Sequence, residues 1–302
     1  MAVEGNYPWE MSPDVVAGSD GAGTVLSVGK KVTRFVPGDK VVTTLFTDHL
    51  SGPVTPATSA GALGTAVDGT LRTHGVFDEQ ALVRMPEGLS FVEASTLSCA
   101  GVTAWNAVFG LPGREPKPGH WVLTQGTGGV SLFALQFAKA AGARVIATTG
   151  SDEKIALLKK LGADHVINYR QTPDWGKVAK EITGGRGVDL VVEVGGPATL
   201  AQSVESIRLE GTMSILGAVS GITLDQGQPR LLDAWLNLFT ARGLWLGNRE
   251  QMEAMCAAIE ADVERLRPVV DPNIFTLDQL KEAYDYLEAG KHTGKVGIEI
   301  SD

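Results

Sequence analysis

Apolar runs and helical apolar patterns alternate through the middle of the chain. A first apolar run, Val122–Gln125, ends in glycines, a helical pattern follows over Val130–Ala141, and a second apolar run covers Arg144–Thr148. The alternation continues to Leu216. Strands that alternate with helices indicate a parallel sheet covered on both faces. We therefore expect an α/β fold built on a Rossmann doubly wound parallel sheet.

The same pattern predicts the remaining elements of this region. Helices are expected at Asp152–Leu161, Trp175–Thr183 and Ala198–Ser206, and strands at His165–Asn168, Asp189–Val194 and Gly211–Leu216. The earlier part of the chain is β-rich, with strands at Ala22–Val28, before Thr43 and at Gly75–Val83, a loop at His49–Asp68, and one or two helices over Ser90–Phe109. The later part predicts an edge strand at Gly243–Leu246, helices at Arg249–Ala261 and Leu277–Glu288, and a closing strand at Lys295–Ile300.

The bulk composition narrows the class of partner. The 302 residues contain 26 Lys plus Arg against 35 Asp plus Glu, a net charge of -9. This balance disfavours nucleic acid or an anionic membrane as the main partner. With two cysteines there is no disulfide framework, and no apolar run approaches the ~20 residues of a membrane span. We expect a cytoplasmic protein that acts on a small molecule.

The glycine-rich turn after the first apolar run is the strongest chemical signal. Its sequence is Gly126-Thr127-Gly128-Gly129-Val130-Ser131. Gly126 permits a tight turn, and Gly128 allows a diphosphate to approach the amides at the start of the next helix. Ser131 stands where the dinucleotide-binding fingerprint usually has its third glycine. A strand before it and a helix after it make this a predicted dinucleotide site, formed by residues 126–130.

The end of the second strand distinguishes NAD from NADP. NAD-binding proteins usually place Asp or Glu there, roughly 20 residues past the glycines, to bind the ribose 2′-hydroxyl. Here the strand ends in Thr149-Gly150-Ser151, with Lys154 close behind and Tyr169-Arg170 after the next strand. A hydroxyl and cations suit a 2′-phosphate, so Ser151, Lys154 and Tyr169 are assigned to NADP(H). The alternative is that Ser151 caps a helix and Lys154 is solvated. The nearby Asp152 and Glu153 weaken the inference.

Two further glycines follow later strands of the predicted sheet. Gly195 follows the fourth strand and Gly217 follows the fifth. Ligands of such sheets bind beyond the carboxyl ends of the strands, so these glycines are candidates to flank ribose and nicotinamide. They are equally compatible with plain turns.

Several motifs spread over the chain point to one family. They are Ala17-Gly-Ser-Asp-Gly-Ala-Gly-Thr-Val25, Gly38-Asp-Lys-Val41, Ala100-Gly-Val-Thr-Ala104, the glycine turn, Lys160-Leu-Gly-Ala-Asp164 and Gly290-Lys-His-Thr-Gly-Lys-Val296. With them the chain resembles the medium-chain dehydrogenase/reductase superfamily, in its zinc-free quinone oxidoreductase-like branch. The resemblance implies a GroES-like β-barrel domain made by residues 1–99 and 248–302, with an NADP-binding Rossmann domain at 100–247. It also implies a homodimer that pairs through the edge strand, and it places Thr103 near the nicotinamide as a catalytic candidate.

The chain also departs from the zinc-bearing members that it resembles. Those members carry Gly-His-Glu where this chain has Gly18-Ser19-Asp20, and four closely spaced cysteines where the loop of residues 46–66 has none. Ser is a poor zinc ligand, and Cys99 alone cannot hold the metal. We therefore predict no metal. The beginning is also short by comparison, because only residues 1–15 precede the Gly-Ser-Asp-Gly segment.

These observations lead to a leading hypothesis and two alternatives. The leading one is an NADPH-dependent, zinc-independent oxidoreductase that transfers hydride to a quinone, an enone or a small carbonyl compound. The alternatives are an alcohol dehydrogenase-like activity, and a non-catalytic NADPH-binding protein that the short beginning would explain. Arg249 is a candidate to close on the cofactor or else a first-turn helix residue. Candidate proton donors and cleft residues, each also compatible with a surface role, are Asp48, His49, His74 and Lys295.

Overall fold

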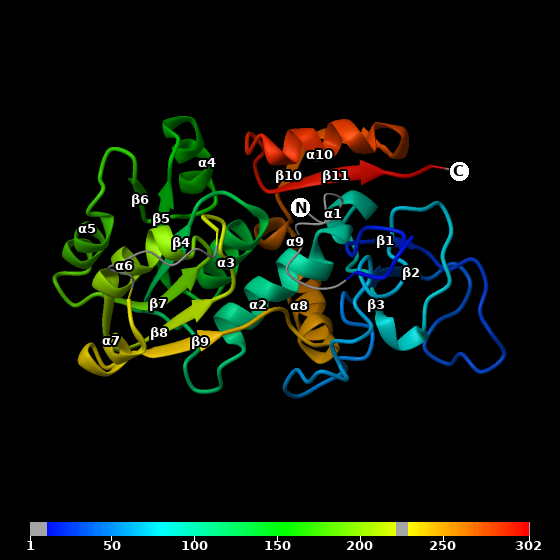
Figure 1. Ribbon diagram of the computed structural model, residues 1–302, viewed down its shortest axis with the longest axis horizontal. Helices are drawn as coiled ribbons and strands as arrows, with labels where there is room; N and C mark the ends of the chain where they lie inside the picture. The colour runs from blue at the N-terminus through cyan, green and yellow to red at the C-terminus, as the bar shows by residue number, and fades with distance from the viewer. Residues whose placement is uncertain (1–10, 222–228, 302) are drawn as a thin grey trace. The chain divides into compact units, whose positions relative to one another are not determined.

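The protein is described by a computed structural model that covers residues 11–221 and 229–301 (Figure 1). The chain divides into two compact units. One is formed by Met1–Val102 together with Gly247–Asp302, and the other by Thr103–Leu246. Among the described residues, no helix is long and apolar enough to cross a membrane.

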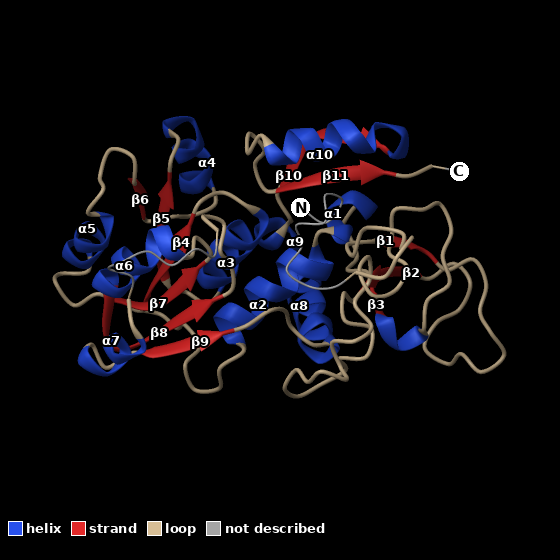
Figure 2. Cartoon of the chain, in the orientation of Figure 1, coloured by secondary structure: helices blue, strands red, loops and turns tan. Residues whose placement is uncertain are grey.

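The second unit is built on a six-stranded parallel sheet (Figure 2). Its order reverses between the two central strands, as in dinucleotide-binding doubly wound folds, so the expected fold class is confirmed. From one edge to the other the strands are β6 (His165–Asn168), β5 (Arg144–Thr149), β4 (Trp121–Gln125), β7 (Val188–Glu193), β8 (Ile207–Ile215) and β9 (Thr240–Gly243).

Helices follow the strands and close the core of this unit. β4 and β7 are buried along their whole length, which explains why apolar residues predominate in them. The core includes Leu123, Ile146, Val191 and Met213. The helices are α2 (Val102–Phe109), α3 (Gly129–Ala140) over β4 and β5, α4 (Ile155–Lys160) beside β6, α5 (Trp175–Ile182) and α6 (Pro197–Ser206) over β7 and β8, and α7 (Leu231–Leu236).

The first unit contains two small sheets among its described residues. An antiparallel sheet joins β1 (Ala22–Thr24), β2 (Lys40–Thr43) and β3 (Leu82–Arg84), and β10 (Val270–Thr276) pairs in parallel with β11 (Lys295–Glu299). Phe35, Val41 and Leu82 form its apolar cluster. Its helices are α1 (Phe91–Ser95), α8 (Arg249–Ala261), α9 (Val263–Leu266) and α10 (Leu280–Glu288).

Several elements differ from the sequence prediction, and α7 and α9 lie where no helix was expected. The edge strand β9 is the polar segment Thr240–Gly243, so the expected strand at Gly243–Leu246 was placed too late. The strand expected at Gly75–Val83 is short and starts only at Leu82, after a turn of 3₁₀ helix. The sequence pattern missed β10 altogether.

Candidate nucleotide-binding site

The glycine turn joins the end of β4 to the start of α3. Gly126 has a φ of 78°, a left-handed conformation that favours glycine. A β-carbon added at Gly126 or Gly128 would meet nothing within 4 Å, so open space lies over both residues. The first helical hydrogen bond runs from the Leu132 amide to the Gly128 carbonyl, and no side chain caps this end. The amides of residues 129–131 therefore have no acceptor within the helix.

Hydrogen bonds to β5 and to the end of β4 hold the turn in place. The Gly126 amide donates to the Thr148 carbonyl at 2.8 Å, which ties the turn to β5. The buried Ser131 hydroxyl donates to the Gln125 carbonyl at 2.6 Å. Serine in the place of the third glycine thus supplies an extra hydrogen bond inside the turn. Thr127 is buried in the same turn, whereas Gly128 is exposed.

This arrangement fits a diphosphate group. Helix N-termini whose first amides are uncapped bind anions, because the N–H groups point outward and the helix dipole is positive there. The open space over Gly126 and Gly128 is where a side chain would otherwise block approach. The predicted residues Gly126, Thr127, Gly128, Gly129 and Val130 are consecutive in this turn.

Cations and a hydroxyl gather at the end of β5. A β-carbon on Gly150 would lie 2.5 Å from the Tyr169 hydroxyl oxygen and 3.1 Å from Arg170 Nε. Both side chains therefore lie against Gly150, and Tyr169 is 42% exposed. The structure brings Tyr169 and Arg170 to the end of β5.

The residues that follow β5, Ser151 to Lys154, form a 3₁₀ turn and its N-cap. The Asp152 carboxylate accepts from Asn168 Nδ2 and Gln171 Nε2, both at 2.7 Å, so it is bound within the protein. Ser151 holds the N-cap position of a 3₁₀ turn, but its hydroxyl does not cap that turn. This 3₁₀ turn, Asp152–Lys154, ends with Lys154, which the sequence pattern assigns to NADP(H) together with Ser151 and Tyr169.

Gly195 and Gly217 are explained at least in part by packing. A β-carbon at Gly217 would lie 2.7 Å from the Val194 carbonyl oxygen, and one at Gly195 would lie 2.3 Å from the Thr199 hydroxyl. The Gly195 amide donates to Glu193 Oε1 at 2.9 Å. Both residues lie beyond the carboxyl ends of their strands, but close packing alone requires glycine there.

Thr103 begins the second unit, next to the start of α2. Its side chain is 3% exposed, and its hydroxyl donates to the Trp245 carbonyl at 3.4 Å. Nearby, Asn106 Nδ2 donates to the Leu246 carbonyl. These bonds tie α2 to the segment that follows β9.

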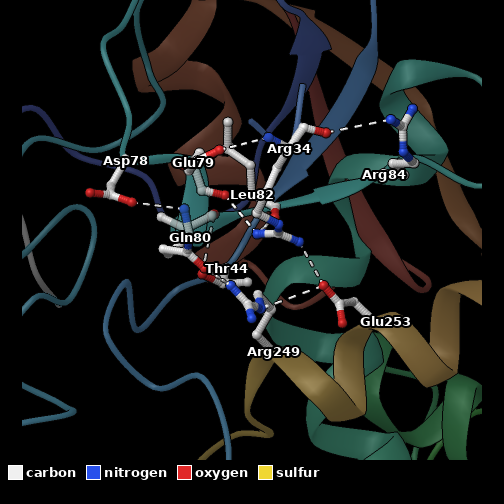
Figure 3. Close-up of polar contacts among 10 residues, drawn as sticks. Arg34, Thr44, Asp78, Glu79, Gln80, Leu82, Arg84, Arg249 and Glu253 are labelled. Atoms are coloured by element: carbon white, nitrogen blue, oxygen red, sulfur yellow. Dashed lines mark hydrogen bonds and ion pairs between the residues drawn. The ribbon is translucent and has the colours of Figure 1, made fainter. Parts of the chain in front are cut away.

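Arg249 is the first residue of α8, and its guanidinium is engaged inside the first unit. It contacts Gln80 Oε1, and its Nε lies 3.5 Å from Glu253 Oε1 (Figure 3). Glu253 also accepts from Arg34 at 2.7 Å. The contacts favour the first-turn helix interpretation of Arg249 over direct cofactor binding.

Asp20, which stands in the segment where zinc-bearing members carry Gly-His-Glu, forms an ion pair. Lys295 Nζ lies 2.7 Å from Asp20 Oδ2, and the Ser19 hydroxyl donates to Asp20 Oδ1 at 3.2 Å. The Asp20 carboxylate, helped by the charge of Cys99, raises the pKa of Lys295 above its ordinary value. Within the described residues there is no group of three or more His, Cys, Asp or Glu that could hold a metal ion. The donor set does not fit zinc, because an ammonium already neutralises its carboxylate.

The three candidate proton donors lie in the first unit. Asp48 and His74 are exposed. His49 is 6% exposed, and its Nε2 lies 3.0 Å from the Gly52 carbonyl. Since a carbonyl only accepts, Nε2 carries a proton and donates it to this bond. The His49 carbonyl receives the Arg249 amide at 2.9 Å, which fastens this loop to the start of α8.

Sequence reasoning missed one residue of this region, Glu193. It ends β7 and is fully buried, with hydrogen bonds to both turns beyond the central strands. A carboxylate directly after the three apolar strand positions Leu190, Val191 and Val192 was the available signal, because an ionised group is rarely buried there without a dedicated set of donors.

Comparisons with known proteins agree with this architecture. Residues 1–87 match the family described as alcohol dehydrogenase GroES-like domain, and residues 129–261 match the family described as zinc-binding dehydrogenase. A zinc-type alcohol dehydrogenase-like protein of Schizosaccharomyces pombe is 45% identical over 99% of this chain and 86% of its own length.

Two solved structures show the same fold. A putative alcohol dehydrogenase from Sinorhizobium meliloti 1021 superposes with a TM-score of 0.87 at 38% identity, covering 97% of this chain and 84% of that one. A quinone oxidoreductase from Pseudomonas syringae pv. Tomato DC3000 superposes with a TM-score of 0.77 at 27% identity, with the same coverage of 97% and 84%.

Proposed function

The chain belongs to the medium-chain dehydrogenase/reductase superfamily, among the zinc-type alcohol dehydrogenase-like proteins, and we propose that it is an NADPH-dependent oxidoreductase that works without zinc. Its substrate in this proposal is a small carbonyl compound or the corresponding alcohol. The similarity to alcohol dehydrogenases supports this alternative more strongly than the quinone hypothesis.

One observation carries the proposal: the open, uncapped start of α3 over Gly126 and Gly128. The amides of residues 129–131 would hold the diphosphate. A bound nicotinamide cofactor would supply hydride to the substrate. The glycine turn, fixed by Ser131 and Thr148, would orient it without further rearrangement.

The end of β5 supports NADP(H) over NAD(H). The Arg170 guanidinium and the Tyr169 hydroxyl lie against Gly150, and the Asp152 carboxylate is bound to Asn168 and Gln171. A guanidinium forms strong bonds to a 2′-phosphate, whereas a free carboxylate would repel it. Ser151 and Lys154 are proposed as the other ligands of that phosphate.

The donor set around Asp20 and Lys295 supports a zinc-independent reaction. Asp20 is paired with an ammonium, and serine stands where a metal ligand would be needed. Charge on the substrate oxygen would then be stabilised by hydrogen-bond donors of the protein. Thr103 is a candidate donor, although its hydroxyl is already bonded to the Trp245 carbonyl.

Quinone or enone reduction is the second candidate. The same donor set favours it, because a conjugated acceptor delocalises the developing charge and needs less polarisation than a simple ketone. The structural similarity to a quinone oxidoreductase is compatible with this function.

We also propose a homodimer that pairs through β9. This strand is at the edge of the sheet, and Leu231 and Trp235 of the preceding helix α7 are 90% and 68% exposed. An open sheet edge beside apolar side chains usually has a partner.

The test is a binding titration followed by turnover. We expect NADPH to bind more tightly than NADH, and to be oxidised with an aldehyde, ketone, enone or quinone panel. A strong metal chelator should leave the rate unchanged. Binding without turnover would favour a non-catalytic NADPH-binding protein, and absence of binding to either nucleotide by a folded sample would refute the proposal.

A further inference from the structure

Glu193 is a buried carboxylate in which both oxygens are occupied. It is 0% exposed. Its Oε1 accepts from the amides of Gly195 and Gly196, both at 2.9 Å, and from the Thr199 hydroxyl at 2.5 Å. Its Oε2 accepts from Gln125 Nε2 at 2.7 Å and from the Ser203 hydroxyl. Five donors therefore compensate for the burial of one negative charge.

Gln125 connects this carboxylate to the glycine turn. It directly precedes Gly126 and is 6% exposed. Its Oε1 accepts from the amides of Val194 and Gly195 at 3.1 and 3.2 Å, and its Nε2 also donates to Ser203 at 2.8 Å. The side chains of Glu193 and Gln125 thus join the turn after β4 to the turn after β7.

The position of this pair in the sheet gives it a functional meaning. β4 and β7 are the neighbouring strands between which the strand order reverses. In open α/β sheets, ligands bind beyond the carboxyl ends of the strands at this point. The donors to Glu193 come from the last residue of β4, from the turn after β7 and from the first two turns of α6.

We infer that Glu193 is a positioning residue that fixes both turns in the geometry that binds the cofactor. The inference rests on the proposed function for its ligand. Glu193 does not touch the cofactor in this proposal. It acts through Gln125 on residues 126–129 and directly on Gly195 and Gly196.

The main test variant is Glu193→Gln, which keeps the size and replaces an acceptor with an NH₂ donor. That donor would face other donors, which breaks the network without leaving a cavity. We expect the dissociation constant for NADPH to rise about tenfold or more in folded protein. In the cofactor-free protein, hydrogen exchange at the Gly195 and Gly196 amides should accelerate by a similar factor.

A swapped pair tests the network directly. Gln125→Glu alone sets two carboxylates against each other, and it should weaken binding as well. The double variant Glu193→Gln/Gln125→Glu restores one carboxylate and one amide in contact. We expect it to recover a large part of the affinity, which is the non-additivity typical of contacting residues.

The control is Asp189→Asn at the opposite end of the same strand. Asp189 is 7% exposed and is bound to Arg186, Arg208 and the Trp121 amide. This variant should lower the melting temperature while leaving the NADPH dissociation constant within about twofold of wild type, because the affected contacts lie far along β7 from the glycine turn.

The outcomes separate this inference from the proposed function. A folded Glu193→Gln protein with wild-type NADPH affinity and wild-type exchange at Gly195 and Gly196 would overturn the inference. If that variant does not fold, Ser203→Ala, which removes one donor, decides by the same two measurements with a smaller expected change. If wild-type protein binds neither nucleotide, the proposed function fails, and the exchange measurement alone decides whether Glu193 fixes the two turns.

Discussion

At the end of β5, one missing side chain makes room for two others. Gly150 has no β-carbon, and the Tyr169 hydroxyl and Arg170 Nε lie so close to it that a β-carbon there would collide with the hydroxyl. Of the two carboxylates that weaken the NADP prediction, Asp152 and Glu153, the first accepts hydrogen bonds from Asn168 and Gln171. A cation and a hydroxyl therefore lie at the place where NAD-binding proteins usually have an acid.

Arg170→Ala tests this residue. Removing a charge-assisted bond to a 2′-phosphate costs about 1.5–3 kcal/mol, or roughly 10- to 150-fold in affinity. We expect that loss for NADPH and almost no change for NADH, measured by titration with each nucleotide. Arg144→Ala is the control, since Arg144 begins β5, at the opposite end of that strand from Gly150, and stacks over the Trp121 ring at 5.3 Å. Equal weakening of both nucleotides by Arg170→Ala would contradict the role.

The absence of zinc is a second prediction at the scale of residues. Asp20 is held by Lys295 at 2.7 Å, and Ser19 bonds to Asp20 rather than offering an imidazole. We expect elemental analysis of purified protein to find well below one zinc per chain. Incubation with a chelator should change neither the melting temperature nor the turnover. Stoichiometric zinc whose removal abolishes turnover would contradict this interpretation.

At the scale of elements, periodicity predicted what was buried and missed what was not. The strands β4 to β8 and their helices were predicted because their apolar runs face the core. β10 was missed because Asp271, Pro272 and Asn273 are poor strand formers. α7 was missed because its apolar residues are exposed and form no buried face. Glu193 was missed because its donors are spread over residues 125–203, and sequence spacing does not reveal that they meet.

Asp271 shows why β10 forms despite its sequence. The carboxylate is 3% exposed and accepts from the Asn273 amide and the Thr293 amide, both at 2.9 Å, and from the Tyr286 hydroxyl at 3.2 Å. Burial by itself would raise the pKa of Asp271, but these hydrogen bonds outweigh it and lower the pKa of this carboxyl below its ordinary value. One residue thereby links β10 to α10 and to the segment before β11.

Asp271→Asn is the corresponding prediction. A depressed folded-state pKa contributes stability that is present above the unfolded value and lost as pH falls through the folded value. We expect the variant to lose about 1–3 kcal/mol of unfolding free energy near neutral pH. That difference should shrink as the pH falls below about 4, measured by urea unfolding at several pH values. A difference that stays constant down to the acid limit would show that Asp271 acts by packing alone.

For the whole molecule, the net charge bears on how the cofactor binds, and the exposed apolar surface bears on association with a second copy of the chain. The net charge of -9 opposes a dianionic or trianionic cofactor, so the cations at the end of β5 must act locally. The apolar surface on α7, in contrast, adjoins β9 at the edge of the sheet. The Phe239 amide donates to the Ala234 carbonyl, so α7 leads directly into β9. An exposed apolar helix next to an open sheet edge suits a two-fold self-complementary contact.

Trp235→Glu tests the dimer. The indole is 68% exposed, and burying it against its own copy would contribute part of the association energy, whereas two glutamates would repel each other. We expect wild-type protein to have the mass of two 31.8 kDa chains by light scattering, and the variant to shift toward a single chain. Val76→Glu is the control, because Val76 is 95% exposed and belongs to the first unit. Its mass should remain that of the dimer. A monomeric wild type would remove the dimer proposal while leaving the nucleotide site untouched, because the glycine turn, Glu193 and Arg170 all belong to one chain.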